Sequence, residues 1–373
     1  ANGERKELLA LPGARIWQPR YDASGHILFR RTPTSPGIWA IPFSLESLSV
    51  TGDPFLVEAD AAEPCPAGDG TLAFRQGGES GRYQLAWVNR TGRVIEAISE
   101  VSGRIGQGVI SPDGKRVAAT IEESDNMDIW VFDLGRGTRT RLTFDSGSDI
   151  RPQWTPDGST LVYFNTSKGY VMSRAADGTG LEEVLFPGFT PTMSPDGRFV
   201  VYEIDDSIKL RPFPVDTTVA PTVVVTGNPD AVQPSVSPDG KYLAYASNES
   251  GRWEIYVTRF PSGEGKWQVS TDGGSWPRWN RRGDRLYYQF NSTLSEVDVD
   301  GGGGIALGRP HALFRGDSLG VNLNPSTSFD TMQGDRFVVN VSAGDESERQ
   351  MLRIRIVQNW FEEFRGQVAA KKD

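Results

Sequence analysis

An all-β fold made of repeated four-stranded sheets is what the sequence predicts, on two observations. The first is that a glycine closing a turn, followed by a β-rich run, recurs eight times in the 373 residues at intervals of 39 to 51 residues. That period is typical of propeller blades and not of helical repeats. The repeated glycines are Gly25, Gly70, Gly114, Gly158, Gly197, Gly240, Gly283 and Gly334. We therefore expect an eight-bladed β-propeller, with seven blades as the alternative.

The second observation is the composition around each glycine. Three copies end in Ser-Pro-Asp-Gly, as at residues 111–114. Proline presets φ for a turn, aspartate bonds its own backbone, and glycine takes the positive φ. In six copies another proline stands six residues before the glycine, at Pro19, Pro64, Pro152, Pro191, Pro234 and Pro277. Each copy therefore predicts a first strand and the tight turn that ends it.

Further β-rich runs follow each turn and complete the blades. Second strands are expected at residues 26–29, 71–74, 116–121, 160–164, 199–204, 242–247, 285–290 and 336–341. Third strands are expected at 38–43, 83–88, 128–134, 170–174, 208–213, 254–260, 294–299 and 351–357. Outer, fourth strands fit only seven places, at 54–57, 94–98, 138–144, 183–186, 222–226, 267–270 and 311–314.

The missing eighth outer strand predicts how the ring closes. Residues 6–11 (KELLAL) precede the first motif just as each outer strand precedes the next one. We expect them to complete the last blade beside residues 351–357, which would leave only short, protected sheet edges. The prediction is one monomeric propeller over residues 1–366 and a disordered tail at 367–373.

Composition excludes several classes of partner. The formal net charge is −9 and no basic run stands out, which disfavours binding to nucleic acid or to anionic lipid. No apolar run is long enough to span a membrane, and the first five residues lack the core of a signal peptide. Cys65 is the only cysteine, and we expect it to be a buried, small apolar residue.

Enzymatic chemistry has few candidate residues. His26 and His311 are the only histidines, so a histidine-rich metal site is excluded and a Ser-His-Asp triad has few candidates. No G-x-S-x-G motif, glycine-rich phosphate loop, HRD or DFG occurs. We expect a protein that is not an enzyme and has neither cofactor nor metal.

The clearest repeats carry a resemblance to a known family. They read DIWVFDL and RLTF, then PQWTPDG and ADGTGLEEVLF, between residues 128 and 186. This order resembles the TolB-like, WD-like propeller repeats of bacteria, above all the copies that follow the membrane segment of eukaryotic-like serine/threonine kinases, and it extends over residues 6–365. The resemblance implies an extracytoplasmic sensor module that binds a small molecule, glycan or protein and is anchored through a segment outside this chain. The alternatives are the gating propeller of a prolyl-oligopeptidase-type peptidase and a free periplasmic TolB-like scaffold.

The candidate binding site follows from the first strands. If these strands line a central channel, the residues on either side of the motif's proline form rings at one mouth. Arginine and tryptophan among them would offer hydrogen-bond donors and aromatic faces to an acidic or sugar-like ligand. The alternative is that these side chains only solvate a water-filled channel. The predicted site residues are Gln18, Arg20, Glu63, Gln107, Arg151, Gln153, Thr190, Gln233, Trp276, Arg278 and Thr327.

Two other patterns have plainer interpretations. The acidic loop at residues 122–128 could gather oxygen ligands for Ca²⁺, but it lacks the glycine and distal glutamate of an EF-hand loop, so a solvated loop is favoured. The apolar column four residues before the glycines is expected to pack between blades. Its members are Tyr21, Ile110, Trp154, Met193, Val236 and Trp279.

Overall fold

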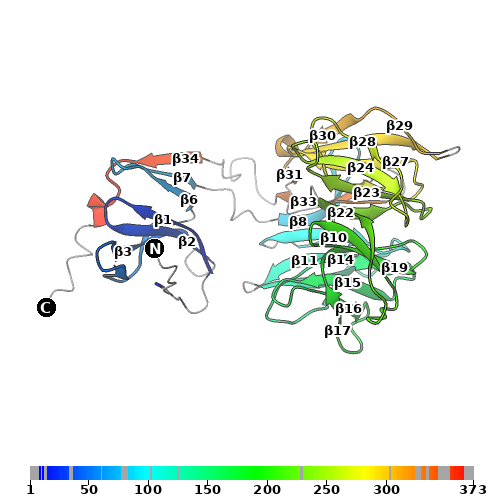
Figure 1. Cartoon of the computed structure of the whole chain (residues 1–373), viewed down its shortest axis with the longest axis horizontal. Coiled ribbons are helices and arrows are strands. Elements are labelled where there is room, and N and C mark those ends of the chain that lie inside the picture. Colours follow the sequence, from blue (N-terminus) through cyan, green and yellow to red (C-terminus); the bar gives the residue numbers. More distant parts are fainter. Residues whose placement is uncertain are drawn as a thin grey trace. The chain divides into compact units, whose positions relative to one another are not determined.

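The computed structural model divides the chain into two compact units (Figure 1). Unit 1 comprises Ala1–Gly81 and Gly344–Asp373, and unit 2 comprises Arg82–Ala343. The structure describes residues 8–9, 11, 15–32, 37–59, 61–76, 83–100, 103–123, 126–226, 230–301, 304–323, 329–332, 336–342 and 353–364.

Unit 2 contains six antiparallel sheets. Five of them follow one another along the chain. They are β10 (Ile105–Ile110), β11 (Arg116–Glu123), β12 (Asn126–Asp133) and β13 (Thr138–Arg141); β14 (Asp149–Trp154), β15 (Thr160–Asn165), β16 (Tyr170–Ala175) and β17 (Glu183–Pro187); β18 (Phe189–Met193), β19 (Phe199–Ile204), β20 (Ser207–Pro212) and β21 (Thr222–Val225); β22 (Ala231–Val236), β23 (Tyr242–Ser247), β24 (Glu254–Arg259) and β25 (Trp267–Gln268); and β26 (Ser275–Trp279), β27 (Arg285–Phe290), β28 (Thr293–Asp300), β29 (Ala306–Leu307) and β30 (His311–Arg315).

The sixth sheet joins the two ends of unit 2. Strands β8 (Tyr83–Val88) and β9 (Val94–Ala97) come from its beginning. The 3₁₀ turn η1 (Asp317–Leu319) and strands β31 (Val321–Asn322), β32 (Asp330–Met332) and β33 (Arg336–Ser342) come from its end. β33 pairs with β8 from Phe337 opposite Val88 to Ser342 opposite Tyr83. Residues far apart in sequence therefore share one ladder.

The inner strands of these sheets form a closed circuit. Contacts run in order through β10, β14, β18, β22 and β26, then from β26 to β32 and from β32 back to β10. Buried clusters fill the spaces between neighbouring sheets, with Tyr163 and Leu161 in one of them and Tyr288 and Leu286 in another. Unit 2 is thus a ring of packed sheets, as radial repeats predict.

Unit 1 holds the remaining two sheets. One contains β1 (Arg15–Asp22), β2 (His26–Thr32), β3 (Gly37–Ser44), β4 (Ser49–Val50) and β5 (Phe55–Ala59). The other contains β6 (Ala61–Pro66), β7 (Leu72–Gln76) and β34 (Arg353–Val357), which is followed by the 3₁₀ turn η2 (Glu362–Phe364). In Figure 1 the red β34 lies beside the blue β7. Leu28, Ile38, Leu72, Phe74 and Trp360 form the core between the two sheets.

The predicted second, third and outer strands are confirmed in position, but two pairings are wrong. Residues 83–88 were expected beside 71–74, and residues 351–357 beside 336–341. Instead β8 pairs with β33, and β34 pairs with β7. The cause is that all the second strands share one pattern, as do all the third strands, so local sequence does not specify which second strand a third strand joins.

Ring closure through residues 6–11 stays a prediction. Leu8, Leu9 and Leu11 are described and form no strand, while the other three residues of this segment lie outside the described part. Six sheets close the circuit of unit 2 and two more form unit 1, so a single ring of eight or seven blades over residues 1–366 is not confirmed. The proposed tail at 367–373 lies outside the described residues.

The turns have the predicted chemistry. The seven described repeat glycines have φ between 70° and 85°. At residues 111–114 the hydroxyl of Ser111 donates to Asp113 Oδ1 at 2.6 Å, and the Gly114 N–H donates to the Ser111 carbonyl at 2.9 Å. The hydrogen bond from Ser111 and another from the Lys115 N–H hold the pKa of the Asp113 carboxyl below its usual value. The turn is therefore closed by its own side chains.

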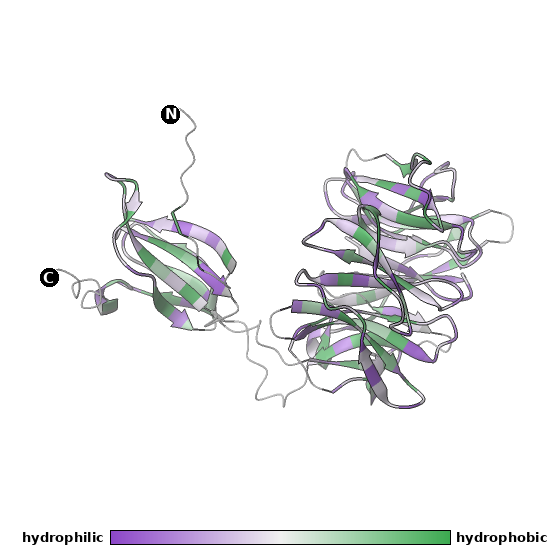
Figure 2. Ribbon diagram, turned by 90° about the horizontal axis from the view of Figure 1, so that it is seen from below, coloured by the Kyte–Doolittle hydropathy of each residue, from purple (hydrophilic) through white to green (hydrophobic). Residues whose placement is uncertain are grey.

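Two tryptophans of the apolar column pack between sheets as expected, whereas Tyr21 of that column is 44% exposed. The indole N–H of Trp154 donates to the Val109 carbonyl at 3.1 Å, and that of Trp279 donates to the Ser235 carbonyl at 3.0 Å. Each indole thus joins its strand to the preceding inner strand. In Figure 2 apolar (green) and polar (purple) segments occur side by side along the strands.

Two further observations concern single features. Cys65 is exposed on β6, so the expectation that it is buried is wrong; it lies on a sheet with only three described strands. No helix among the described residues is long and apolar enough to cross a membrane.

Candidate binding site at the centre of unit 2

The residue before the motif's proline has an unusual backbone conformation. Gln18, Glu63, Arg151, Thr190, Gln233 and Trp276 all have positive φ, between 42° and 58°. The strand register shifts at each of these positions, so each residue occupies a β-bulge. Such a conformation costs on the order of 1–3 kcal/mol in a residue other than glycine, and a bulge redirects the side chain. Because it recurs, this β-bulge is a common feature of the first strands.

Side chains of neighbouring sheets bond to the backbone at these bulges. The Trp276 N–H donates to Gln233 Oε1 at 2.7 Å, and the Gln233 N–H donates to Glu203 Oε1 at 2.5 Å. Asn340 Nδ2 donates to the Ile105 carbonyl at 2.7 Å, beside the bulge of β10. The polar groups that a bulge releases from its own ladder are thus used to join one sheet to the next.

Arg151 and Trp276 meet across the centre of the circuit. The guanidinium carbon of Arg151 lies 4.2 Å from the centroid of the Trp276 ring, and that of Arg278 lies 5.9 Å from the same centroid. β14 and β26 are three places apart in a circuit of six sheets, which makes them opposite one another. Their contact therefore places both residues at the axis of unit 2. We call Arg151, Glu203, Gln233, Trp276, Arg278 and Asp330 the central cluster.

The two cations of the central cluster form no ion pair with its acids among the described residues. Burial lowers the pKa of Arg151 to about 10, although the Glu203 charge opposes the shift and the Arg278 charge adds to it. Burial also lowers the pKa of Arg278, and the Asp330 charge opposes that shift. Within the described part of the chain, Arg278 donates one hydrogen bond, to the Pro277 carbonyl at 3.2 Å, and Arg151 has neither a hydrogen bond nor an ion pair. Both guanidiniums keep most of their donor capacity.

The two acids of the central cluster are held by backbone N–H groups. Glu203 accepts from Gln233, and Asp330 Oδ2 accepts from the Ile110 N–H at 2.7 Å. Burial raises the pKa of both carboxyls, while these hydrogen bonds and the Arg151 and Arg278 charges oppose it. Neither acid forms an ion pair with these arginines among the described residues. The charges are therefore close enough to interact but are not paired.

A third arginine spans the opposite end of the ring. Arg281 stands in the turn after β26, at a position where four of the other repeats have proline. Its guanidinium donates to the carbonyls of Pro112 at 2.5 Å and Ser111 at 2.7 Å, in the turn after β10. This contact passes over β32, which lies between β26 and β10 in the circuit. The positive turn thus joins two sheets that are not neighbours.

The structure separates the predicted site residues into two groups. Gln18, Arg20 and Glu63 lie exposed on β1 and β6 of unit 1. In unit 2, Arg151, Gln233, Trp276 and Arg278 are brought together, and Thr190 is hydrogen-bonded to Glu203. Gln107 and Gln153 lie on neighbouring β10 and β14, and Thr327 lies outside the described residues.

Sequence reasoning missed Glu203, Asp330 and Arg281. Asp330 stands four residues before Gly334, in a column whose other members in unit 2 are apolar, so an acid there was a detectable signal. Glu203 is a charged residue within the apolar run of β19. Only the fold shows that Glu203 reaches the next inner strand.

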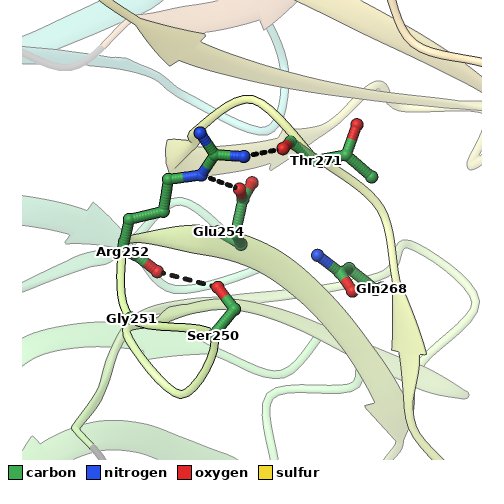
Figure 3. A pocket seen from close by; sticks show the side chains of 6 residues that line it. All are labelled: Ser250, Gly251, Arg252, Glu254, Gln268 and Thr271. Atoms are coloured by element: carbon green, nitrogen blue, oxygen red, sulfur yellow. Dashed lines mark hydrogen bonds and ion pairs between the residues drawn. The ribbon is translucent and has the colours of Figure 1, made fainter.

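Other polar groups are weaker candidates. A hollow of about 330 Å³ is lined by Ser250, Gly251, Arg252, Glu254, Gln268 and Thr271 (Figure 3). Its charged groups already bond to one another and to the chain. Arg252 Nε donates to Glu254 Oε1 at 2.6 Å, and Glu254 also accepts from Ser270 and from the Gly273 N–H. Both charged side chains of the hollow, Arg252 and Glu254, are thus already bonded within the protein.

The acidic loop at residues 122–128 is engaged in part. Asp128 is buried and accepts from the Arg141 guanidinium at 2.7 Å, and Ser124 and Asp125 lie outside the described residues. Burial raises the pKa of Asp128, and the Arg141 charge opposes that shift. No group of three His, Cys, Asp or Glu side chains in the described ranges is placed to hold a metal ion.

Comparison with known proteins finds a similarity to TolB propellers in part of the chain. Residues 78–218 match the family model "TolB beta propeller domain". The match lies within unit 2 apart from its first four residues and includes Arg151, Thr190 and Glu203. The resemblance predicted from DIWVFDL and PQWTPDG is thus confirmed over this segment, and its further closeness to kinase sensor propellers is not shown.

Individual relatives agree with this assignment. The chain is 29% identical over 114 residues to "Tol-Pal system protein TolB" of Wolinella succinogenes, which is 30% of this chain and 27% of that protein. It is 26% identical over 106 residues to "Uncharacterized peptidase YuxL" of Bacillus subtilis, which is 25% of this chain and 16% of that protein. The chain therefore spans about a quarter or less of each relative.

A solved structure supports the fold. "The structure of putative TolB from Agrobacterium tumefaciens" superposes with a TM-score of 0.56 and 17% identity, over 71% of this chain and 99% of that one. At this identity the similarity concerns the fold alone. It agrees with an all-β architecture of radially repeated, four-stranded antiparallel sheets.

Proposed function

We propose that this chain is a non-catalytic binding protein of the TolB-like scaffold type, that it acts outside the cytoplasm, and that its ligand binds at the central cluster of unit 2. The observation that carries the proposal is that Arg151 reaches across the circuit of sheets to lie over the Trp276 ring, with Arg278 near the same indole. Taking a guanidinium out of water costs several kcal/mol unless it is paired. A purely structural core would be more stable with apolar side chains, so the arginines favour binding.

The relatives support the scaffold over the receptor-kinase interpretation. A TolB protein of the Tol-Pal system matches over 114 residues, and the propeller model that matches is a TolB one. The extracytoplasmic location rests on this similarity. The kinase-sensor interpretation has no support from these relatives and takes second place.

A peptidase propeller is the second candidate, because YuxL matches over 106 residues. In that case the chain would be the non-catalytic propeller of a larger hydrolase. A hydrolase domain encoded directly after these residues in the parent gene would support the peptidase, and its absence would support the scaffold.

Thermal unfolding of the full chain tests binding at the central cluster. A ligand selective for the native state raises the melting temperature. Acidic sugars, peptidoglycan fragments and short peptides form the panel. We expect at least one of them to raise the melting temperature, and Trp276→Phe to abolish that rise. The matched control is Trp253→Phe, at a partly exposed indole elsewhere in unit 2. A rise that survives Trp276→Phe would contradict the proposed site.

A further inference from the structure

We propose that the central cluster recognises a single carboxylate, which the guanidiniums of Arg151 and Arg278 hold beside the Trp276 ring. This inference rests on the proposed function and names the chemistry of its ligand. It starts from the two arginines, which approach one indole from two different inner strands, β14 and β26.

The geometry of Arg151 selects a planar anion. Its guanidinium carbon lies over the Trp276 ring, 4.2 Å from the ring centroid. A stacked guanidinium keeps its N–H donors in its own plane, where they form a fork that matches the two oxygens of a carboxylate. Arg278 contributes a second cation that is nine-tenths buried and has one described hydrogen bond. Together they supply more donors than the surrounding protein uses.

The local charge balance favours one negative charge over two. Two cations, Arg151 and Arg278, stand near two acids, Glu203 and Asp330, and each acid already accepts a backbone N–H. A monovalent anion adds one charge to a cluster that is close to neutral. A divalent anion such as phosphate would add two in a setting of low dielectric, where repulsion by the acids is strong. The cluster therefore fits a carboxylate better.

Gln107 provides an independent observation. It belongs to the same pre-proline column and lies on β10, between β14 and β32 in the circuit. Its side chain is 3% exposed, and neither its amide oxygen nor its amide nitrogen has a hydrogen-bond partner among the described residues. Buried amides are nearly always satisfied, so an unsatisfied one beside the cluster indicates a missing polar partner.

The carboxylate could come from a small acid or from an acidic peptide, and the test separates these sources. The full chain is titrated by calorimetry with butyrate, with a blocked tripeptide that has one central glutamate, with the same tripeptide carrying glutamine, and with inorganic phosphate. We expect butyrate or the glutamate peptide to bind, and the glutamine peptide and phosphate to bind at least about tenfold more weakly. Arg151→Gln and Arg278→Gln should each weaken the carboxylate by at least about tenfold.

Controls make each result decisive. Arg151→Lys and Arg278→Lys keep the charge but not the fork, and should show intermediate affinity if the fork matters. Arg136→Gln, at an exposed turn of unit 2, should leave affinity unchanged. Equal binding of the glutamine peptide, tighter binding of phosphate, or no carboxylate binding up to about 50 mM would overturn the inference. If carboxylates fail to bind but a neutral ligand of the thermal-unfolding panel still needs Trp276 to raise the melting temperature, the proposed function stands and only the carboxylate inference is lost.

Discussion

The same β-bulge, whose backbone N–H donates to a glutamine side chain, occurs in both units, but it is exposed in unit 1 and buried in unit 2. In unit 1 the Glu63 N–H donates to Gln18 Oε1 at 3.2 Å, and both side chains are exposed. In unit 2 the Trp276 N–H donates to Gln233 Oε1 at 2.7 Å, and Trp276 is 1% exposed. All four residues have positive φ before a proline. Sequence thus encodes the bulge and its hydrogen bond equally in the two places.

What differs is how much protein surrounds the device. Unit 1 has two sheets, whereas unit 2 has six that close a circuit. A closed circuit removes water from residues at its axis and strengthens every charge interaction there. The glutamine side chain, Gln18 or Gln233, therefore accepts a backbone hydrogen bond in both units. Only in unit 2 does the donor, Trp276, lie in a charged and buried centre.

The largest expected effect comes from replacing one tryptophan with alanine in each unit. Trp276→Ala should lower the free energy of unfolding of unit 2 by about 3–5 kcal/mol, because a buried indole is replaced by a cavity. Trp17→Ala, at a side chain that is 50% exposed on β1, should cost less than about 1 kcal/mol. Denaturant titration, analysed with one transition per unit, measures both. Equal losses in the free energy of unfolding would contradict the difference in burial between Trp276 and Trp17.

A pH-dependent effect is expected for a buried acid of unit 2. Burial raises the pKa of Asp149 to about 7, against the hydrogen bonds from Asn165 and Thr143. Because the folded pKa exceeds the unfolded one, the contribution of Asp149 to stability is largest below pH 4 and is lost as pH rises through 7. Asp149→Asn should therefore be more stable than the parent by about 2–4 kcal/mol at pH 8, and this difference should disappear near pH 4.

An acid in a turn provides the control of opposite sign. Hydrogen bonds from Thr155 and Ser159 lower the pKa of Asp157 to about 2. Its contribution is present above the unfolded pKa and lost as pH falls towards 2. Asp157 is nearly fully solvated, so Asp157→Asn should cost less than about 1 kcal/mol at pH 7. A pH-independent effect of Asp149→Asn would contradict the burial of that carboxyl.

Loss of the glutamine acceptor should have a smaller effect. Gln233→Ala removes the side chain to which the Trp276 N–H donates, and should cost about 1–3 kcal/mol because that hydrogen bond is buried. Gln18→Ala removes the matching acceptor in unit 1, where water can replace it, and should cost less than about 0.5 kcal/mol. Thermal unfolding of the two variants compares them directly. A larger cost at Gln18 would reverse the interpretation.

The smallest expected effect tests the backbone strain alone. Gln18 has φ of 52°, so Gln18→Gly should stabilise unit 1 by up to about 0.5–1 kcal/mol, since its exposed hydrogen bond contributes little. Arg20→Gly, two residues on in β1 and without positive φ, should instead destabilise by about 0.5–1 kcal/mol. The same sign for both variants would show that the bulge is not strained.

Periodicity predicted the elements of the fold well. Every predicted second and third strand overlaps a strand of the structure, because turn chemistry and apolar runs act over a few residues. The same repeat pattern predicted four residues of the site. Arg151, Gln233 and Trp276 precede the motif's proline, and Arg278 follows it. The pattern did not predict Glu203, which comes from a second strand and reaches the site only through the packing of β19 against β22.

The sequence alone thus determined where strands and turns lie, which residues form the columns beside the motif's proline, and that residues 78–218 resemble TolB repeats. Tertiary structure decided which strands pair, since β33 joins β8 and β34 joins β7 across more than 240 residues. It also decided that Arg151 meets Trp276 rather than a neighbour in its own sheet. The physical reason is that hydrogen-bonding patterns repeat identically in every sheet, whereas the closing of a circuit is a property of all its sheets together.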